Sequence, residues 1–479
     1  MARAMAGHRY NPVTPAVVDE LKSIVGEKYV IHGDREALEP YSHDEVQDPA
    51  YSHMPEVVVR PRRAEEISAI LRLANRELIP VTPRGAGSGL SGGAVPIYGG
   101  IVLLCDRMNE VLDFDRSNMT ITVEPGVVTN EINELVREAG LFYAGYPMSL
   151  ETCYIGGNVA ENAGGGKAVK YGVTGRYVLG LEFVSPVGEV VVLGGKRVKD
   201  VTGYDLIHLL VGSEGTLGVF TSITLKLVPL PKATVDLLCL FESAERAISV
   251  VPRIMSAGGI VPTAIEFMDQ RSVRAACEYL NESLPYERAG AMLLITLDGS
   301  DECELERQYE VVGELCLDSG AIEVYVADNY TTSERIWKVR RNIGEAFNLV
   351  TKQQCAEDIV VPFAQIPEMV AGIRVLEDKY GVLMPCFGHA GDGNVHIRIV
   401  KDPDSSVESW REKLPKILTE LYELTVSLGG TISGEHGIGH KRKPYLHMVL
   451  SDPAIELMRA IKRAWDPNNI LNPGKIFDV

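Results

Sequence analysis

Apolar residues recur at helical spacing near the start of the chain. Five of them lie between residues 17 and 25, directly after Thr14, which can cap a helix, and Pro15, which suits a first helical turn. Gly26 then predicts the end of this helix. The same spacing of apolar residues over 64–77 predicts a second helix.

Shorter apolar runs in the first 200 residues predict strands. The run that ends at residue 82 leads directly into a glycine-rich segment. Pro186, Val187 and Gly188 form a turn signal between two strand-like runs. The predicted strands cover 57–60, 79–82 and two hairpins, 110–115 with 119–124 and 181–185 with 189–193.

The pattern changes at Pro229-Leu230-Pro231, where we place a domain boundary. Beyond it, strand-like runs alternate with amphipathic helices near 243–257, 269–281 and 303–319, which is an α+β layer pattern. The predicted division is an N-terminal helical segment over 1–56, a first domain over 57–232, a second domain over 233–430 and a C-terminal segment over 431–479.

Net charge narrows the classes of partner. The 479 residues carry a formal charge of −18 with a pI near 5.1. This charge argues against nucleic acids and anionic membranes as the main partners, because binding to them requires basic patches. No apolar run reaches the roughly 18 residues of a membrane span. The opening MARAMAGHRYNP lacks the apolar stretch of a secretory signal, so we expect a cytoplasmic protein without a nucleic-acid partner or a direct membrane span.

The eight cysteines are scattered and form no CxxC pair. Iron–sulfur clusters and structural zinc sites need clustered thiolates, so we expect buried, reduced thiols and no iron–sulfur cluster in this chain.

Two segments are exceptionally rich in glycine. Residues 84–100 hold seven glycines and residues 156–175 hold seven more. Glycines let successive N–H groups approach a ligand, and two such loops, each at a strand exit, suit a diphosphate held from two sides. The alternative is a pair of tight turns. A Rossmann motif at Gly87, Gly89 and Gly92 is rejected, because the glycines and Pro96 that follow oppose the helix that motif requires.

Three motifs in order carry a family resemblance: PRGAGSGLSGG, IGGNVAENAGGGKAVKYGVTGRYV and VTGYDLIHLLVGSEGTLGV. They resemble the FAD domain of the vanillyl-alcohol-oxidase superfamily, in the branch of FAD-linked D-2-hydroxy acid dehydrogenases that contains the glycolate oxidase D subunit and D-lactate dehydrogenases. The resemblance implies an α+β fold with a two-subdomain FAD-binding domain at 57–232, a substrate (cap) domain with an antiparallel sheet at 233–430 and a C-terminal segment that returns to the flavin. The FAD contacts it implies are Pro83, Arg84, Gly85, Ala86, Gly87, Ser88, Gly89, Gly156, Gly157, Asn158, Asn162, Ala163, Gly164, Gly165, Gly172, Glu214, Gly215, Val219 and Asn472.

Covalent members of the superfamily often present a histidine in the first loop. This chain has Ser88 at that place, so we expect FAD to bind without a covalent link.

Five of the ten histidines fall between residues 389 and 447, in and around FGHAGDGNVHIRI and SGEHGIGH. Two imidazoles and one carboxylate form a common ligand set for zinc, manganese or iron. Ordinary hydrogen-bonded histidines without a metal would show the same sequence pattern. The resemblance favours the metal: it implies that His389, His396 and Glu435 bind a divalent ion (Fe, Zn or Mn) and that His436 is the catalytic base.

Arg340 and Arg341 follow Trp337 in a helical run. A guanidinium suits bidentate binding of a carboxylate, whereas a solvated helix face is the simpler interpretation of the residues alone. The resemblance implies that Arg340 binds the substrate carboxylate. Gly344, Ala356 and Arg398 fall at or near positions where the hydroxyglutarate enzyme of this branch has polar substrate contacts. These departures from its pattern favour a smaller acid such as D-lactate or glycolate.

The resemblance therefore implies oxidation of a small D-2-hydroxy acid to the 2-oxo acid by hydride transfer to flavin N5. Electrons would leave to a protein acceptor, an electron-transferring flavoprotein or an iron–sulfur subunit, in a homo- or hetero-oligomer. The alternative is a non-catalytic flavin subunit that relays electrons within a redox complex, and a weaker one is a metal-dependent hydrolase.

Overall fold

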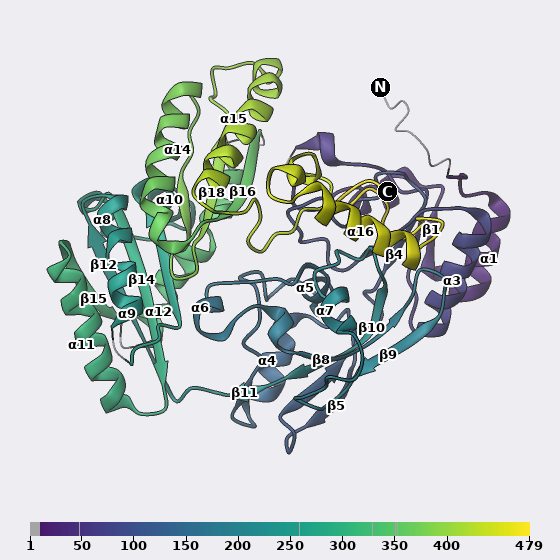
Figure 1. Cartoon of the computed structure of the whole chain (residues 1–479), viewed down its shortest axis with the longest axis horizontal. Helices are drawn as coiled ribbons and strands as arrows, with labels where there is room; N and C mark the ends of the chain where they lie inside the picture. The colour runs from purple at the N-terminus through teal and green to yellow at the C-terminus, as the bar shows by residue number, and fades with distance from the viewer. Residues whose placement is uncertain (1–9, 47, 258, 328, 350, 352) are drawn as a thin grey trace.

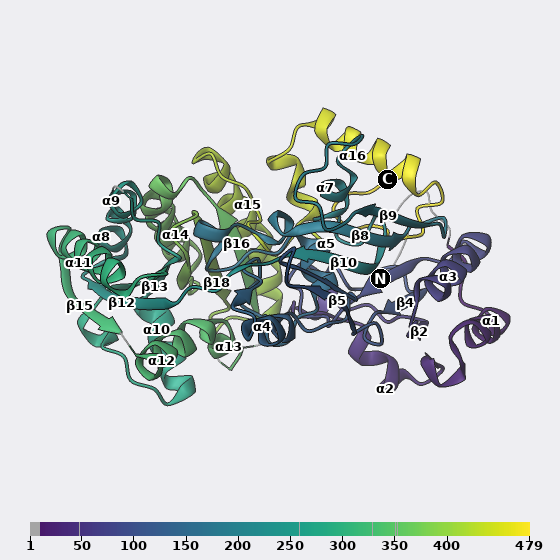
Figure 2. The same ribbon diagram turned by 90° about the horizontal axis from the view of Figure 1, so that it is seen from below.

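The computed structural model describes residues 10–46, 48–257, 259–327, 329–349, 351 and 353–479. The chain folds into two lobes (Figure 1). Elements up to β11 and the yellow C-terminal segment form one lobe, and the elements from β12 to α15 form the other. Figure 2 shows the same two lobes from below, with the C-terminal helix lying on the first. The fold class is α+β, as predicted.

The first lobe begins with a small sheet in the order β1-β2-β4-β3, in which β2, β3 and β4 are parallel. Thr14 accepts a hydrogen bond from the N–H of Val17, and Gly26 follows the helix with a φ of 92°, so the predicted first helix is confirmed at both ends. The second predicted helix is also confirmed. The elements are α1 (Pro15–Val25), β1 (Val30–His32), α2 (Arg35–Leu38), β2 (Val57–Val59), α3 (Ala64–Glu77), β3 (Val81–Arg84) and β4 (Ile101–Leu104).

An antiparallel sheet in the order β5-β6-β10-β8-β9 completes the first lobe, beside a short β11-β7 pair. Both predicted hairpins are present, as β5 with β6 and β8 with β9. The elements are β5 (Val111–Asp115), β6 (Thr120–Val123), α4 (Thr129–Arg137), β7 (Leu141–Phe142), α5 (Ile155–Glu161), α6 (Ala168–Tyr171), β8 (Val178–Val184), β9 (Val190–Gly194), α7 (Leu206–Leu210), β10 (Val219–Lys226) and β11 (Val228–Pro229).

The second lobe is built on a seven-stranded antiparallel sheet in the order β15-β12-β14-β13-β17-β18-β16. Helices cover both faces, since Leu237 and Cys239 of β12 pack into one core and Leu238 and Leu240 into another. The elements are β12 (Ala233–Phe241), α8 (Ala244–Ser249), α9 (Val251–Ser256), β13 (Ala264–Asp269), α10 (Gln270–Leu280), β14 (Ala291–Gly299), α11 (Glu302–Asp318), β15 (Ala321–Ala327), α12 (Tyr330–Arg341), α13 (Ile343–Asn348), β16 (Gln354–Val360), α14 (Ile366–Tyr380), β17 (Cys386–His389), β18 (Asn394–Val400) and α15 (Val407–Ser427).

One helix that the sequence predicts as continuous is two helices in the structure. The helix expected over 243–257 is divided into α8 and α9. Pro252 lies in the first turn of α9, and proline has no N–H to continue the ladder of the preceding helix.

The C-terminal segment crosses back from the second lobe to the first. Leu471 forms a parallel bridge with Val81, and the N–H of Asn472 donates to the Val81 carbonyl at 2.7 Å. α16 (Asp452–Trp465) ends with Trp465 stacked on Phe183, with ring centroids 6.3 Å apart. Residues 431–441 therefore join the edge of the seven-stranded sheet to the glycine-rich part of the first lobe.

Candidate active site

The first glycine-rich loop leaves β3 without starting a helix, which confirms the rejection of a Rossmann motif. Gly87 has a φ of 78°, and a Cβ there would lie 2.2 Å from a terminal guanidinium nitrogen of Arg84. Among the described residues, none accepts a hydrogen bond from the N–H groups of residues 85–90. A run of unclaimed amides of this kind is a nest for anionic oxygens.

The second glycine-rich segment is not the strand exit that the sequence suggested. It opens α5, with Gly156 and Gly157 inside the first turn. A Cβ on Gly156 would meet Pro125 at 2.6 Å, and one on Gly85 would lie 4.0 Å from the N atom of Gly157. Position 156 therefore requires glycine because of its close approach to Pro125, and the first glycine-rich loop lies at van der Waals distance from the start of the helix.

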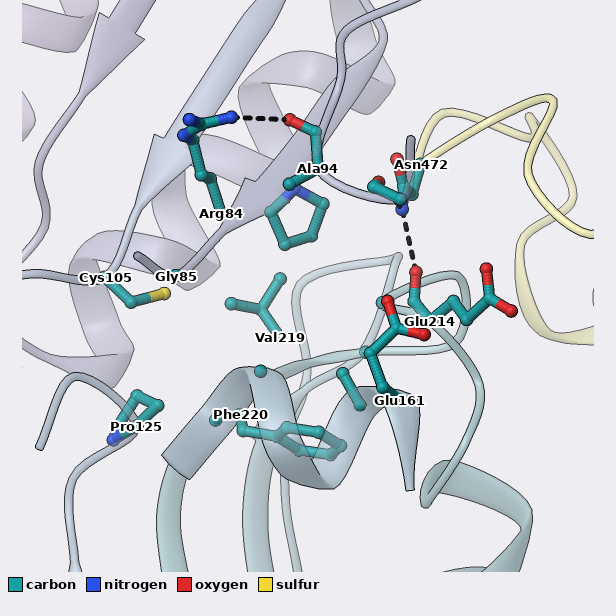
Figure 3. A pocket seen from close by; sticks show the side chains of 17 residues that line it. Arg84, Gly85, Ala94, Cys105, Pro125, Glu161, Glu214, Val219, Phe220 and Asn472 are labelled. Atoms are coloured by element: carbon teal, nitrogen blue, oxygen red, sulfur yellow. Dashed lines mark hydrogen bonds between the residues drawn. The ribbon is translucent and has the colours of Figure 1, made fainter. Parts of the chain in front are cut away.

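Two adjoining cavities lie between these segments, with volumes of about 100 and 260 Å³. Figure 3 shows the smaller one, which is bordered by Arg84 at the end of β3 and by Val219 and Phe220 at the start of β10. Of the predicted FAD contacts, the smaller cavity is lined by Pro83, Arg84, Gly85, Gly156, Gly157, Glu214, Gly215, Val219 and Asn472. The larger cavity is lined by Gly85, Ala86, Gly87, Ser88, Gly89, Gly157, Asn158, Ala163 and Gly164.

Three predicted contacts line neither cavity. Asn162 uses its side-chain oxygen to accept from the N–H of Gly175 at 2.8 Å. Gly165 packs against the backbone of Tyr146, and Gly172 ends α6 with a φ of 80°. All three hold the shape of the second glycine-rich segment.

Glu214 and Asn472 join the C-terminal segment to the first lobe. The Glu214 carboxylate accepts from the N–H groups of Ile438 and Gly439 at 2.7 and 2.6 Å. The Asn472 amide donates to the Glu214 carbonyl at 2.7 Å (Figure 3). These contacts close one wall of the smaller cavity with residues 258 positions apart in the chain.

Sequence reasoning missed Glu161, which lines both cavities. Its Oε2 atom is buried and has no hydrogen-bond partner. Burial and the nearby carboxylates of Glu214 and Asp44 raise the pKa of Glu161 well above its ordinary value, and Arg442 opposes them only in part. A protonated carboxyl at the junction of the two cavities is a hydrogen-bond donor.

The N–H groups of residues 85–90 without an acceptor in the described ranges, the buried Glu161 carboxyl and the two adjoining cavities fit an elongated dinucleotide. Residues 85–90 would hold its diphosphate, and the two cavities would take its two ends. This part of the structure therefore fits FAD.

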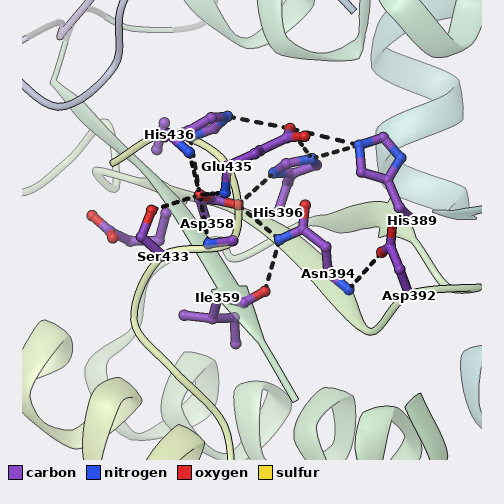
Figure 4. Close-up of polar contacts among 12 residues, drawn as sticks. Asp358, Ile359, His389, Asp392, Asn394, His396, Ser433, Glu435 and His436 are labelled. Atoms are coloured by element: carbon purple, nitrogen blue, oxygen red, sulfur yellow. Dashed lines mark hydrogen bonds and ion pairs between the residues drawn. The ribbon is translucent and has the colours of Figure 1, made fainter. Parts of the chain in front are cut away.

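A cluster of histidines lies beside the larger cavity, on the β17–β18 hairpin and the loop after residue 432 (Figure 4). The Nε2 atoms of His389 and His396 are 3.4 Å apart. Glu435 Oε1 lies 3.6 Å from the first and 3.3 Å from the second. Three donors at these separations can share one ion at the usual bond lengths of about 2.0–2.2 Å. The predicted residues thus converge in a geometry that fits a divalent metal.

Glu266, which the sequence did not single out, orients this set. Its carboxylate binds His389 Nδ1 at 2.7 Å from the paired strand β13, where Glu266 and His389 are in register. A carboxylate on Nδ1 fixes the proton there and leaves the Nε2 lone pair for a metal. The second Glu266 oxygen lies 2.6 Å from Arg340, and both side chains are buried.

Asp358 holds the loop that carries Glu435 and His436. One of its oxygens accepts from Ser433 Oγ and from the N–H groups of Gly434, Glu435 and His436, at 2.8–3.0 Å. The other oxygen accepts from the Asn394 amide at 2.7 Å. Four of these bonds converge on one oxygen and fix the loop backbone, so we treat Asp358 as a positioning residue although it lies among the possible ligands.

His436 lies against this set and belongs to a possible metal-binding group with Asp358, His396 and Glu435. Its ring is stacked on that of His396, with centroids 5.3 Å apart, and its Nε2 is 3.6 Å from Glu435 Oε1. Burial lowers the pKa of His436 to about 4, although Asp358 and Glu435 oppose this shift. The imidazole is therefore neutral near pH 7 and can accept a proton.

A third cavity, of about 740 Å³, opens on the other side of His436 and Glu435. Arg340, Arg341 and Arg398 line it. Arg340 is buried and paired with Glu266, whereas Arg341 is partly exposed and pairs with Glu334. His436 and Glu435 line both this cavity and the larger dinucleotide cavity, so the two cavities adjoin at these side chains.

Glycines let the two sites approach each other. A Cβ on Gly164 would lie 3.1 Å from a Glu435 oxygen, and one on Gly166 would lie 2.7 Å from Glu266. The second glycine-rich segment therefore touches both the dinucleotide cavity and the histidine cluster.

No helix among the described residues is both long and apolar enough to cross a membrane.

Comparison with known proteins agrees with this arrangement. Residues 55–194 match an FAD binding domain, and residues 230–476 match the C-terminal domain of FAD linked oxidases. The chain is 42% identical to glycolate oxidase subunit GlcD of Bacillus subtilis, covering 91% of this chain and 92% of the relative. It is 39% identical to a D-lactate dehydrogenase of Anaerostipes hadrus, covering 98% and 99%.

Solved structures share the fold at low identity. Substrate-bound p-cresol methylhydroxylase superposes with a TM-score of 0.79 at 17% identity, covering 96% of each chain. 4-Ethylphenol oxidase from Gulosibacter chungangensis has a TM-score of 0.77 at 19% identity, covering 96% of this chain and 97% of its own. The fold is that of the vanillyl-alcohol-oxidase type, and the chain belongs to the family of FAD-linked oxidases as an FAD-linked oxidoreductase.

Proposed function

We propose that this enzyme oxidises a small D-2-hydroxy acid, D-lactate or glycolate, to the 2-oxo acid and passes the electrons to a partner protein. One observation carries the proposal. His436 and Glu435 line both the cavity that fits FAD and an adjoining cavity lined by guanidinium groups. An acid bound there would have its reacting carbon between a base and the cofactor. The names of the glycolate oxidase and D-lactate dehydrogenase relatives support the same substrate class.

Each residue of the cluster has a distinct role in this proposal. His436 takes the hydroxyl proton as general base. Arg340 binds the substrate carboxylate, and Glu266 fixes both Arg340 and His389. His389, His396 and Glu435 hold a divalent ion, which when bound supplies Lewis acidity to the hydroxyl oxygen. FAD, held without a covalent link because Ser88 replaces a linking histidine, supplies the two-electron acceptor.

The electron acceptor in this proposal is an electron-transferring flavoprotein or an iron–sulfur subunit. The alternative, a flavin subunit that only relays electrons, needs neither a base nor a substrate cavity. The buried cluster around Glu435 therefore favours the dehydrogenase.

Anaerobic reduction tests the function. D-Lactate or glycolate is expected to bleach the flavin absorption of the purified protein, and L-lactate serves as the stereochemical control. Acid precipitation of the same preparation should release FAD into solution. A fully loaded flavoprotein that no 2-hydroxy acid bleaches would support the electron-relay alternative instead.

Arg340→Lys is expected to raise KM for the acid about 10- to 100-fold with little change in FAD content. Lysine keeps the charge but loses the planar fork that can bind a carboxylate while still contacting Glu266. Steady-state kinetics and flavin content provide the measurement. Arg341→Lys is the matched control, since Arg341 pairs with Glu334 at the cavity rim and should matter less. Equal effects of the two substitutions would contradict the choice of Arg340.

FAD affinity is expected to fall as pH rises, because Glu161 binds the cofactor as a protonated donor. The raised pKa means that the favourable form exists at low pH, and ionisation places a negative charge beside the diphosphate. Above the apparent pKa, affinity should drop about tenfold per pH unit, and Glu161→Gln should remove this dependence. Titration of apoprotein with FAD across the pH range in which the protein stays folded measures it. The exposed Glu302→Gln is the control, and a pH-independent wild type would rule the role out.

A further inference from the structure

Arg398 extends the cavity wall away from the histidine cluster. It lies on β18 two residues after His396, and alternate residues of a strand share a face. On the neighbouring strand β16 its register partner is Ala356, whereas that of His396 is Asp358. The same 740 Å³ cavity is lined by Arg398, His396 and His436.

The guanidinium of Arg398 is unpaired. Within the described part of the chain, its side chain has no ion-pair partner and no hydrogen-bond acceptor. Arg340 and Arg341, by contrast, each bind a carboxylate of this chain. A largely buried guanidinium with five unused donors is costly unless an anion enters from the cavity.

Gly344 makes the room that this guanidinium occupies. A Cβ at Gly344, on α13, would lie 2.6 Å from a terminal nitrogen of Arg398. Gly344 has no positive φ, so its backbone conformation does not call for glycine. Its missing side chain therefore serves the position of Arg398, and the small Ala356, the register partner of Arg398, also lines the cavity.

We infer that Arg398 is a specificity-determining residue that binds a carboxylate of the substrate, and that Gly344 keeps it in position to do so. The inference rests on the proposed function, because the ligand is the acid oxidised beside His436. The planar fork of arginine matches a carboxylate with two parallel hydrogen bonds.

Two substitutions test this on the FAD-loaded enzyme. Arg398→Lys removes the fork and keeps the charge. Gly344→Ala keeps Arg398 and displaces it, and since the clash is with the end of a flexible side chain, the fold should survive. Both should weaken binding of oxalate, which is followed by its perturbation of the flavin spectrum. Both should also raise KM about 10- to 100-fold, for D-lactate if Arg398 binds the carboxylate next to the reacting carbon, or for D-malate alone if it binds a second carboxylate. Arg307→Lys and Gly313→Ala, both on α11, are the matched controls.

Comparison of D-lactate with D-malate shows which substrate carboxylate Arg398 binds. A loss with D-lactate places Arg398 on the carboxylate next to the reacting carbon, and a loss confined to D-malate places it on a distant second carboxylate. Both support the inference. Unchanged oxalate affinity and unchanged KM for both acids in Arg398→Lys would overturn it. If no acid bleaches the wild-type flavin while oxalate still binds through Arg398, the proposed oxidation fails and the carboxylate site stands.

Discussion

Glu435→Ala is expected to empty the metal site and abolish acid oxidation together, while FAD remains bound. Glu435 Oε1 lies within 3.6 Å of the Nε2 atoms of His389 and His396, so it supplies the only carboxylate of the proposed set. Two buried imidazoles without that anion should hold a divalent ion poorly, because the metal charge is then balanced less well and one coordination position is lost. Metal analysis, flavin content and anaerobic reduction rates on one preparation measure the three effects.

Glu423→Ala is the control, because Glu423 is an exposed carboxylate on α15. It should keep metal, FAD and activity. A Glu435→Ala enzyme with a full metal complement would show that the ligand set is wrong. Loss of FAD along with the metal would point instead to the contact between Glu435 and Gly164.

The elements that sequence predicts well are those that local rules define. α1 has a capping threonine, a first-turn proline and a terminal glycine, and the structure uses all three. α5 was not predicted, because Gly156 and Gly157 each disfavour a helix by about 1 kcal/mol relative to alanine. Contacts with Pro125 and with the first glycine-rich loop decide its conformation, and they depend on residues about 30 to 70 positions away.

The residues of the candidate site also fall into those that local sequence motifs identify and those that depend on distant contacts. His389, His396, Glu435 and His436 lie in two glycine-flanked motifs, and the structure brings these residues together. Glu266 and Asp358 were missed because an acid within a strand carries no sequence signal that identifies its partner. Their partners become visible only through strand register, as in the pairing of Glu266 with His389. A charged residue inside an apolar run such as AIEFMD is the signal that could have marked Glu266.

Arg340 shows how the structure refines a prediction from the sequence. A guanidinium on a helix could face solvent or substrate, and the residues alone left both open. In the structure Arg340 is buried, contacts the face of Phe387 and binds the carboxylate that orients His389. If Arg340 binds the substrate as proposed, that binding would be coupled through Glu266 to the orientation of His389.

His436→Ala is expected to slow flavin reduction by about 10²–10⁴-fold while metal and FAD both remain. The loop keeps its position without the imidazole, because Asp358 binds the backbone N–H groups of residues 434–436 at 2.8–3.0 Å. The three proposed ligands are also unchanged, so the site should stay assembled but lack its proton acceptor. Stopped-flow reduction by D-lactate, with metal analysis of the same samples, gives the two readouts.

The exposed His447→Ala is the control for losing an imidazole from this segment, and it should match the wild type. Loss of metal in His436→Ala would make His436 a ligand, which its 3.6 Å separation from Glu435 Oε1 would then explain. The base would have to be sought elsewhere, and His440 is poorly placed for it, since its ring packs against Tyr51 and His53 and lines none of the three cavities. An unchanged reduction rate with metal and FAD in place would remove His436 from the proton transfer altogether.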